Sequence, residues 1–323
     1  MFAPTVLRCD PKLFEKDLTD QVIIVTGANS GIGLETARQL AKQHATVIMA
    51  CRNEEKAKAA MDDITLSCSS AKLVFLPLDL SSLENVREFV KSFTSQYTRL
   101  DILIANAGIM MCPYSKTKDG FESQMGCNHL AHFLLLQLLI PTLLKTADTT
   151  NKPSRFIAVS SVAAASTTAM GQGSIDFDDL LWETRKYDAG KAYGQSKLAN
   201  YLTAYEASQK YDSSKLISVS LHPGWVRSNL DVHVLSSGFV GNAIRNLVQW
   251  MGHMIGPVDG AQTTLHCALE DDIQSGGWYS QFGIYKNKSA KAGGWPLPKM
   301  PNANATPEAA SKLWNMSEEL VNS

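Results

Sequence analysis

The chain has 323 residues, of which 45% are hydrophobic and 19% are charged, and its formal net charge is −1. This is the composition of an ordinary globular protein with enough apolar material for a large core, so global disorder is excluded. The near-zero charge and the lack of a long basic run argue against nucleic acid as a partner.

The first 20 residues are predicted to form an N-terminal extension. Charged residues are mixed among the apolar ones, so we expect neither a secretion signal nor a membrane span in this stretch. The longest apolar run, 133–144, is shorter than the roughly 20 residues that a span needs. Six scattered cysteines form no C-x-x-C pair, and His129 and His132 have no third ligand, so we expect no metal site and interpret both histidines as structural. Free thiols suit a reducing compartment, and we expect a soluble intracellular protein, most simply a cytoplasmic one.

Short apolar runs alternate with longer segments of helical period through residues 21–221. Each run is nearly continuous in apolar residues, as strands buried on both faces are. The alternation predicts an α/β fold, a Rossmann-type doubly wound parallel sheet in a single domain, 21–323. The predicted strands are 22–26, 45–50, 72–78, 100–105, 155–160 and 216–221. The predicted helices are 31–43, 54–66, 83–97, 128–144, 194–211 and 307–320, the last reached through an extended connection at 293–301.

Two segments interrupt the alternation, an insertion at about 162–191 and a stretch at about 230–256. Both follow predicted strands, where the ligand-binding loops of such sheets gather. Apolar residues recur at roughly helical spacing in the second segment, so we predict a lid over a hydrophobic substrate there. Ordinary core and peripheral contact with a membrane surface are the alternatives.

A glycine-rich sequence directly follows the first predicted strand and opens the first predicted helix. Gly27 allows a tight turn, Gly31 lets the backbone approach a pyrophosphate, and Gly33 lets helix and sheet pack closely. The phosphates would lie at the helix N-terminus, where N–H groups and the helix dipole favour negative charge. A glycine-rich turn without a ligand is the alternative, but the strand before it and the helix after it favour a dinucleotide.

The end of the second strand indicates which dinucleotide binds. An acidic residue there would bind the ribose hydroxyl of NAD, but the chain has Arg52 and no carboxylate. A guanidinium pairs with a phosphate through two hydrogen bonds, so we predict NADP(H); the alternative is that Arg52 is a solvent-exposed charge. Asp79, after the third strand, either accepts a hydrogen bond from adenine or caps the next helix.

Tyr193 and Lys197 are four residues apart in a predicted helix and therefore face the same way. The pKa of a free tyrosine is about 10, and a neighbouring ammonium lowers it by stabilising the phenolate. Such a pair can exchange a proton with a substrate. In isolation the spacing also occurs in surface pairs, so the assignment depends on the motifs around it.

In chain order the motifs are T-G-x-x-x-G-x-G at 26–33, Asp79-Leu80, Asn106-Ala107-Gly108, Asn128, Ser160-Ser161, Tyr193 with Lys197, and Pro223-Gly224. Together these motifs resemble the short-chain dehydrogenase/reductase family over about residues 18–269. Within that family, segments 109–121, 128–133 and 196–200 are similar to the retinol-dehydrogenase-like branch, which includes retinal reductases, the WW-domain oxidoreductase and the chloroplast translocon-associated dehydrogenase.

The resemblance implies a role for each of these residues. Tyr193 would be the general acid or base, and Ser161 would hydrogen-bond the substrate oxygen. Lys197 would also bind the nicotinamide ribose, and Asn128 would hold a proton-relaying water. Taken singly, Ser161 could cap a turn, Asn128 could cap a helix, and Pro223-Gly224 could simply end a strand. The cofactor-binding residues implied are Gly27, Asn29, Ser30, Gly31, Ile32, Gly33, Arg52, Asp79, Leu80, Asn106, Ala107, Gly108, Tyr193, Lys197, Pro223, Gly224, Val226 and Ser228.

Two features depart from the simplest family pattern. Ser228 stands where the family usually has threonine, and it keeps the hydroxyl. Ser161 and Tyr193 are 32 positions apart (193 − 161) because of the insertion, a feature that the retinol-dehydrogenase-like branch shares. The insertion's Leu181, Trp182 and Tyr187 would either wall the pocket or block an oligomer contact.

The sequence thus predicts an NADP(H)-dependent oxidoreductase that interconverts a carbonyl and an alcohol on a lipophilic, retinoid-, steroid- or aldehyde-like substrate, and it leaves the oligomeric state open. Nucleotide-sugar epimerases use a similar Tyr/Lys pair, but their G-x-x-G-x-x-G fingerprint does not match Gly27, Gly31 and Gly33. The alternative is an NADP(H)-binding regulatory or scaffold protein of the same fold. The complete set of Ser161, Tyr193 and Lys197 argues against it.

Overall fold

The computed structural model describes residues 5–167, 171–227 and 254–323. Its centre is an eight-stranded sheet in the order β10-β9-β6-β5-β4-β1-β2-β3, parallel throughout except for the pair β9–β10. Because β1 lies between β2 and β4, the strand order reverses beside it, and doubly wound sheets bind ligands in the crevice at such a point. The strands are β1 (Val22–Thr26), β2 (Thr46–Cys51), β3 (Lys72–Pro77), β4 (Ile102–Ala105), β5 (Ser154–Val159), β6 (Leu216–His222), β9 (Trp278–Ser280) and β10 (Gly294–Leu297).

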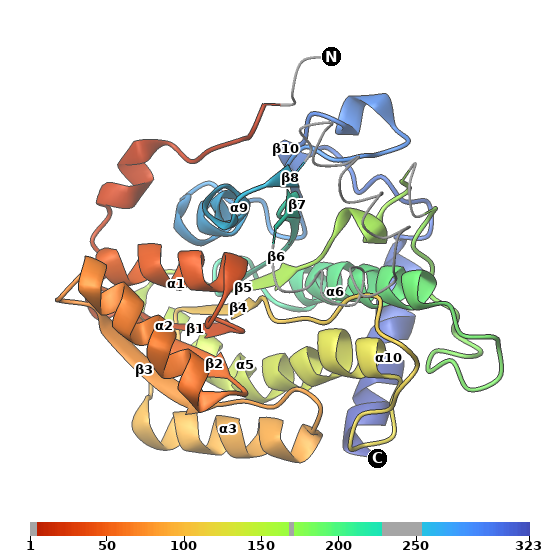
Figure 1. Cartoon of the computed structure of the whole chain (residues 1–323), viewed down its shortest axis with the longest axis horizontal. Coiled ribbons are helices and arrows are strands. Elements are labelled where there is room, and N and C mark those ends of the chain that lie inside the picture. Colours follow the sequence, from red (N-terminus) through yellow and green to blue (C-terminus); the bar gives the residue numbers. More distant parts are fainter. Residues whose placement is uncertain (1–4, 168–170, 228–253) are drawn as a thin grey trace.

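Helices cover both faces of the sheet (Figure 1). Ile23 and Val25 of β1 belong to a core with α1, α2 and α9, whereas Val22 and Ile24 belong to a core with α3 and α5. This division follows from the strand itself, since successive side chains point to opposite faces. α10 packs against both α5 and α6. The helices are α1 (Gly31–Lys42), α2 (Glu54–Ser67), α3 (Leu83–Gln96), α5 (Ala131–Thr150), α6 (Ala189–Lys210), α9 (Pro257–Leu269) and α10 (Pro307–Asn322).

The predicted doubly wound parallel sheet is confirmed, and each of the six predicted strands is found within two residues of its expected ends. The expectation of only six strands is wrong. β9 and β10 extend the sheet beyond β6, and the connection expected at 293–301 contains β10. Both strands are too short to show a periodic pattern, and glycine and proline in β10 suggested a loop.

Two helices are longer than predicted. α6 begins at Ala189, because the Asp188 side chain caps it by accepting a hydrogen bond from the N–H of Lys191 at 3.0 Å. Tyr193 therefore lies inside this helix and not before its first residue. The helix expected at 128–144 is one segment made of α4 (Ser123–Met125), the π-helical turn η2 (Gly126–Leu130) and α5.

That segment, Ser123–Thr150, is long and apolar enough by length and composition to cross a membrane. Two thirds of its most apolar stretch is buried inside the protein, where α5 packs against α3 and β5. The core helix of a globular protein passes the same test of length and composition, so this segment alone is weak support for a membrane span.

Candidate active site

The loop between β1 and α1 has the backbone shape of a phosphate cradle. Gly27 and Gly31 have φ angles of +66° and +57°, in the left-handed region that strains any residue with a side chain. A Cβ on Gly33 would lie 2.5 Å from Nδ2 of Asn106 and 2.6 Å from the carbonyl oxygen of Gly27. Ser30 is the N-cap residue, but its side chain makes no hydrogen bond to α1 in the described part of the chain. The N–H groups of the first turn therefore suit an anion such as a pyrophosphate.

Thr26 connects this loop to the end of β4. Its hydroxyl oxygen accepts hydrogen bonds from the N–H groups of Asn106 and Ala107, each at 2.9 Å, and Asn106 Nδ2 donates to the carbonyl oxygen of Thr26 at 2.8 Å. The predicted Asn106-Ala107 motif thus lies directly against the glycine loop.

His132 extends this connection into the helical layer. Its Nε2 lies 2.9 Å from the Thr26 hydroxyl, and its Nδ1 lies 3.0 Å from the carbonyl oxygen of Asn128. Burial lowers the pKa of His132 to about 4, so the ring is neutral at neutral pH. A carbonyl can only accept, so Nδ1 carries the proton and Nε2 accepts from Thr26. The sequence indicated a structural histidine but not this link, although His132 is one turn from Asn128.

Asn128 is buried in the π-helical turn η2, in which the N–H of Ala131 bonds to the carbonyl oxygen of Gly126. Its Oδ1 accepts from the N–H of Ile109 at 2.8 Å. Its Nδ2 donates to the carbonyl oxygen of Ile109 and to the Ser196 hydroxyl, both at 2.9 Å. The alternative that Asn128 caps a helix is therefore wrong. Its side chain joins the loop after β4 to α6, and π-helical turns often occur at functional sites.

Tyr193 and Lys197 come together inside α6. Both are buried, with 6% and 4% of their surface exposed, and the ammonium lies 5.9 Å from the centre of the tyrosine ring. Lys197 Nζ also donates to the carbonyl oxygen of Val159, at the end of β5, at 3.0 Å. A Cβ on Gly108 would lie 3.1 Å from Asn128 Oδ1 and 3.3 Å from Lys197 Nζ, so the absence of a side chain lets the loop after β4 approach both groups.

Burial lowers the pKa of Lys197 to about 8, because it disfavours the charged ammonium. Next to it, the Ser160 hydroxyl donates to the carbonyl oxygen of Lys197 at 2.5 Å. Ser161 caps the short helix η3 (Val162–Ala164), because its hydroxyl oxygen accepts from the N–H of Ala163 at 3.2 Å. This capping contact was one predicted alternative, and it leaves the hydroxyl proton available for another acceptor.

Arg52 and Asp79 lie at the ends of β2 and β3. Arg52 is exposed and forms no ion pair with any residue that the structure describes. The Asp79 carboxylate accepts from the N–H and the hydroxyl of Ser81, at 3.0 and 2.7 Å, and pairs with Lys118 at 3.1 Å. Burial raises the pKa of Asp79, but these contacts outweigh it and the net shift is downward. The N-cap of α3 is Ser82, so the alternative that Asp79 caps this helix is wrong; Leu80 packs against the core beside it.

Pro223 and Gly224 follow β6 and lead into the short strand β7 (Trp225–Val226). Gly224 has a φ of +92°, and a Cβ there would lie 2.9 Å from the Ile255 side chain. Val226 is buried and belongs to the same apolar cluster as Ile32 of the glycine loop. The two ends of the predicted cofactor site therefore pack against each other.

Ser228 and most of the predicted lid at 230–256 lie outside the described residues. The end of that segment forms β8 (Met254–Ile255), which pairs in parallel with β7.

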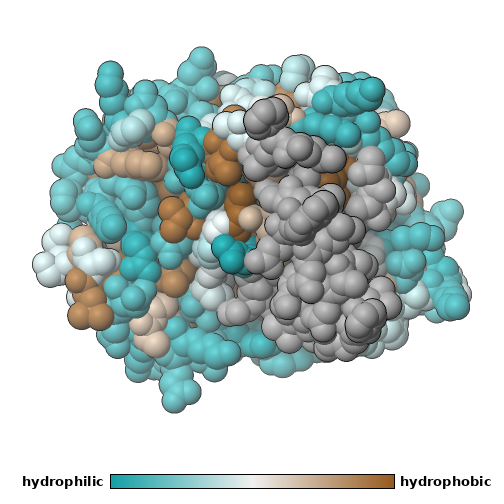
Figure 2. Space-filling model, turned by 45° about the horizontal axis from the view of Figure 1, so that its top comes forward, coloured by the Kyte–Doolittle hydropathy of each residue, from teal (hydrophilic) through white to brown (hydrophobic). Residues whose placement is uncertain are grey.

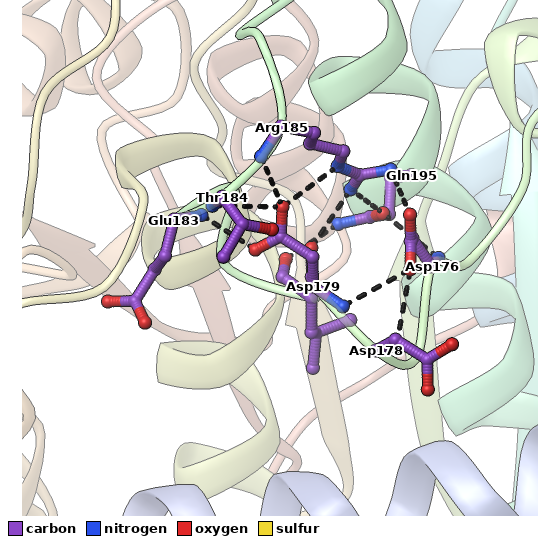
Figure 3. Close-up of polar contacts among 8 residues, drawn as sticks. Asp176, Asp178, Asp179, Glu183, Thr184, Arg185 and Gln195 are labelled. Carbon is purple, nitrogen blue, oxygen red and sulfur yellow. Dashed lines mark hydrogen bonds and ion pairs between the residues drawn. The ribbon is translucent and has the colours of Figure 1, made fainter.

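A network of hydrogen bonds folds the insertion onto α6 (Figure 3). Arg185 donates to Asp176 and to Gln195, both at 2.8 Å, and its guanidinium lies 3.6 Å from the centre of the Trp182 ring. Gln195 lies between Tyr193 and Lys197 in the chain, so the insertion is anchored beside these two residues. The Asp179 carboxylate accepts from the N–H groups of Glu183, Thr184 and Arg185, at 2.6, 3.2 and 3.0 Å.

The three insertion residues that were expected either to wall the pocket or to block an oligomer contact take separate partners. Trp182 is buried under Arg185, and the Tyr187 hydroxyl lies 2.9 Å from Glu122 Oε1 and accepts from Gln124 Nε2 at 2.8 Å. Leu181 lines a groove of about 360 Å³ against α10. This groove contains none of the predicted site residues. Within the described residues, no three His, Cys, Asp or Glu side chains are grouped closely enough to hold a metal ion.

Comparison with known proteins identifies relatives along nearly the whole chain. Residues 21–173 match the family model described as short chain dehydrogenase. Human retinol dehydrogenase 12 is 39% identical over 309 residues, which cover 94% of this chain and 87% of that protein. Human retinol dehydrogenases 11 and 13 are 38% and 39% identical, over 94% and 93% of this chain and 86% and 84% of their own length.

Solved structures share the same architecture. An uncharacterised protein from Mycobacterium paratuberculosis superposes with a TM-score of 0.71 at 32% identity, covering 95% of this chain and 96% of that one. A short-chain dehydrogenase from Shigella flexneri complexed with NADP has a TM-score of 0.61 at 25% identity, covering 81% and 97%.

Proposed function

The chain belongs to the short-chain dehydrogenase family, in its retinol-dehydrogenase-like branch, and from this membership we propose that it interconverts a carbonyl and an alcohol on a lipophilic substrate with NADP(H). Oxidoreductase activity on alcohols and a nicotinamide cofactor follow from the family. The cofactor's phosphate, the substrate and the residue roles are our proposals.

One observation carries the proposal: Lys197 and Asn128 converge on Gly108, and Tyr193 lies beside Lys197 in α6. Lys197 comes from α6 and Asn128 from the π-helical turn η2, two separate segments that the fold brings together. The loop that contains Gly108 also contains Asn106, which contacts the glycine loop through Thr26. This loop therefore links the proposed proton-transfer pair to the proposed phosphate site.

In reduction, Tyr193 would give its proton to the carbonyl oxygen of the substrate. Ser161 would donate its hydroxyl proton to the same oxygen, where negative charge develops. The ammonium of Lys197 would favour the phenolate that remains on Tyr193. When bound, the nicotinamide would supply the hydride. In oxidation each residue would act in the opposite sense.

Asn128 is proposed to support catalysis by holding two segments together. Both N–H groups of its side chain are already used, one by Ile109 and one by Ser196. Ser196 lies next to Lys197, and Ile109 follows Gly108. The side chain therefore fixes the distance between the loop after β4 and α6, and a proton-relaying water would depend on this spacing.

The preference for NADP(H) rests on Arg52. Its exposed guanidinium follows β2, and no ion pair with the residues described here would have to break before it bound a phosphate. The Shigella relative that was solved with NADP supports this choice. To bind the adenosine of the cofactor, the Asp79 carboxylate would have to accept a further hydrogen bond besides those from Ser81.

A retinoid is the proposed substrate class, because relatives that are 38% and 39% identical over nearly the whole chain are named retinol dehydrogenases. To test the proposal, purified protein is mixed with NADPH or NADH and with retinal, a steroid ketone, an aliphatic aldehyde or a quinone, and the absorbance of the reduced cofactor is followed. We expect retinal to be consumed, faster with NADPH. Firm NADPH binding without consumption of any carbonyl would instead support the regulatory alternative.

A further inference from the structure

The segment ahead of the first strand packs beside the proposed cofactor site. Residues 5–9, which we call the N-terminal strap, lie along the outside of α9 before the chain reaches β1 (Figure 1). Gln281, fully buried, holds the strap by both polar groups of Leu7: Oε1 accepts from its N–H at 3.0 Å, and Nε2 donates to its carbonyl oxygen at 2.5 Å.

Two residues of α9 hold the other side of the strap. Arg8 forms an ion pair with Asp259 at 2.9 Å, and the N–H of Cys9 donates to Gln262 Oε1 at 3.0 Å. The Arg8 pair is largely exposed and therefore contributes little to holding the strap. The buried contacts of Gln281 and Gln262 therefore define where the strap runs.

Under the strap lies an apolar cluster that joins two separate loops. Val6 packs against a cluster of Val226, Ile255 and Phe282, together with Ile32. Ile32 is the second residue of α1, in the glycine loop, and Val226 is in β7, after Pro223-Gly224. A Cβ on Gly260 would overlap with Val226 and lie 3.2 Å from Ile32, so both side chains sit directly on α9 at this glycine.

From these contacts we propose that the N-terminal strap is a positioning element for the dinucleotide, with Val6 and Gln281 as its positioning residues. By covering the cluster, the strap keeps the glycine loop and β7 at a fixed separation. This proposal rests on the proposed function, in which the glycine loop binds the pyrophosphate and β7 lines the nicotinamide. On the face shown in Figure 2, hydrophobic residues gather near the middle of the surface, between hydrophilic ones.

The expected effect is a loss of preorganisation. If a weakened strap leaves only a tenth of the molecules with the two loops correctly spaced, the apparent dissociation constant for NADPH rises about tenfold. A ligand that occupies only the adenosine end, such as adenosine 2′,5′-bisphosphate, does not bridge the two loops. Its affinity is expected to stay the same.

The test compares two glutamines that hold the same N-terminal extension. Gln281→Leu removes both bonds to Leu7. Gln43→Leu is the matched control, because Gln43 is also buried and its Nε2 donates to the carbonyl oxygens of Leu13 and Lys16, at the far end of α1. NADPH and adenosine 2′,5′-bisphosphate are titrated into each variant by calorimetry, and thermal unfolding is recorded in parallel.

We expect Gln281→Leu to weaken NADPH about tenfold and adenosine 2′,5′-bisphosphate less than about twofold. Gln43→Leu should lower the unfolding temperature without changing either affinity. Val6→Ala tests the strap without touching Gln281. We expect it to weaken NADPH about threefold and, like Gln281→Leu, to affect adenosine 2′,5′-bisphosphate much less. Combined with Gln281→Leu it should add little, since both act through one element.

Unchanged NADPH affinity in both Gln281→Leu and Val6→Ala would overturn the proposal, as would an equal loss in Gln43→Leu. A wild-type protein that binds no NADPH at all would instead refute the proposed function, and the role of the strap with it. The two failures are therefore distinguishable.

Discussion

The ammonium of Lys197 lies 5.9 Å from the centre of the Tyr193 ring and is held there by a hydrogen bond to the carbonyl oxygen of Val159 at 3.0 Å. The lysine is thus fixed from β5, and not only through its place on the tyrosine's own helix. A charged group with a fixed position can stabilise a phenolate without first reorganising.

Replacing the phenol tests the proton-transfer role of this pair. Tyr193→Phe should lower turnover by about a thousandfold, because general acid catalysis contributes factors of this order, and should leave NADPH affinity nearly unchanged. Initial rates and calorimetric titrations give the two quantities. Tyr201→Phe makes the same change on the same helix, where the ring packs on Trp278, and should keep its activity. Normal turnover in Tyr193→Phe would refute the mechanism.

Removing Arg52 tests the cofactor preference. Arg52→Ala should weaken NADPH by about tenfold or more, since hydrogen bonds to charged groups contribute about 1.5–3 kcal/mol. NADH has no 2′-phosphate, and its affinity should change little. Lys56→Ala removes another exposed cation, four residues further on in the first turn of α2, as the control. Equal losses of affinity for NADPH and NADH would show that Arg52 does not bind the 2′-phosphate.

Gly33 and Gly190 should respond to alanine with opposite signs. In Gly33→Ala the new Cβ would lie 2.5 Å from Asn106 Nδ2, so we expect a loss of roughly 1–3 kcal/mol in the free energy of unfolding. Gly190, in α6, has only ordinary contacts at 3.4 Å and beyond, and alanine favours helix there by about 0.5 kcal/mol. Urea unfolding measures both. A Gly33→Ala protein as stable as wild type would contradict the packing described.

Acid should destabilise the fold through its buried histidines. Burial lowers the pKa of His129 to about 3, against about 6.5 in an unfolded chain. As the pH falls below 6.5 the unfolded chain gains a proton that the folded one does not, so stability is full above pH 6.5 and is lost progressively down to about pH 3.

Urea midpoints between pH 7 and pH 4 should therefore fall less steeply for His129→Gln than for wild type. His44→Gln is the control, because that ring is exposed in the fold. An unchanged slope in His129→Gln would mean that other groups dominate acid unfolding.

The sheet could be predicted because its central strands are buried on both faces and therefore appear in the sequence as apolar runs. β9 and β10 could not, since three or four residues carry no period and their places depend on pairing with β6 and with each other. The early start of α6 depends on the cap at Asp188, a local signal that was present and overlooked.

In the candidate site too, residues in local sequence patterns could be predicted, and residues whose role depends on distant contacts could not. Gly33 and Tyr193 belong to local patterns, and the sequence was enough to single them out. His132 was seen only as a structural residue, because its role comes from meeting Thr26, 106 positions away. The partners of the strap are more distant still: Leu7 and Gln281 are 274 positions apart, and no local pattern joins them.

The π-helical turn around Asn128 has one further consequence. Such a turn holds one more residue than a regular α-helix would, and each residue of an α-helix turns the next by about 100°. Deleting a single residue from this turn would restore a regular α-helix. With the apolar side of α5 kept on the sheet, Asn128 would then rotate away from its partners Ile109 and Ser196. The extra residue of the π-helical turn is therefore what orients the Asn128 side chain toward its partners.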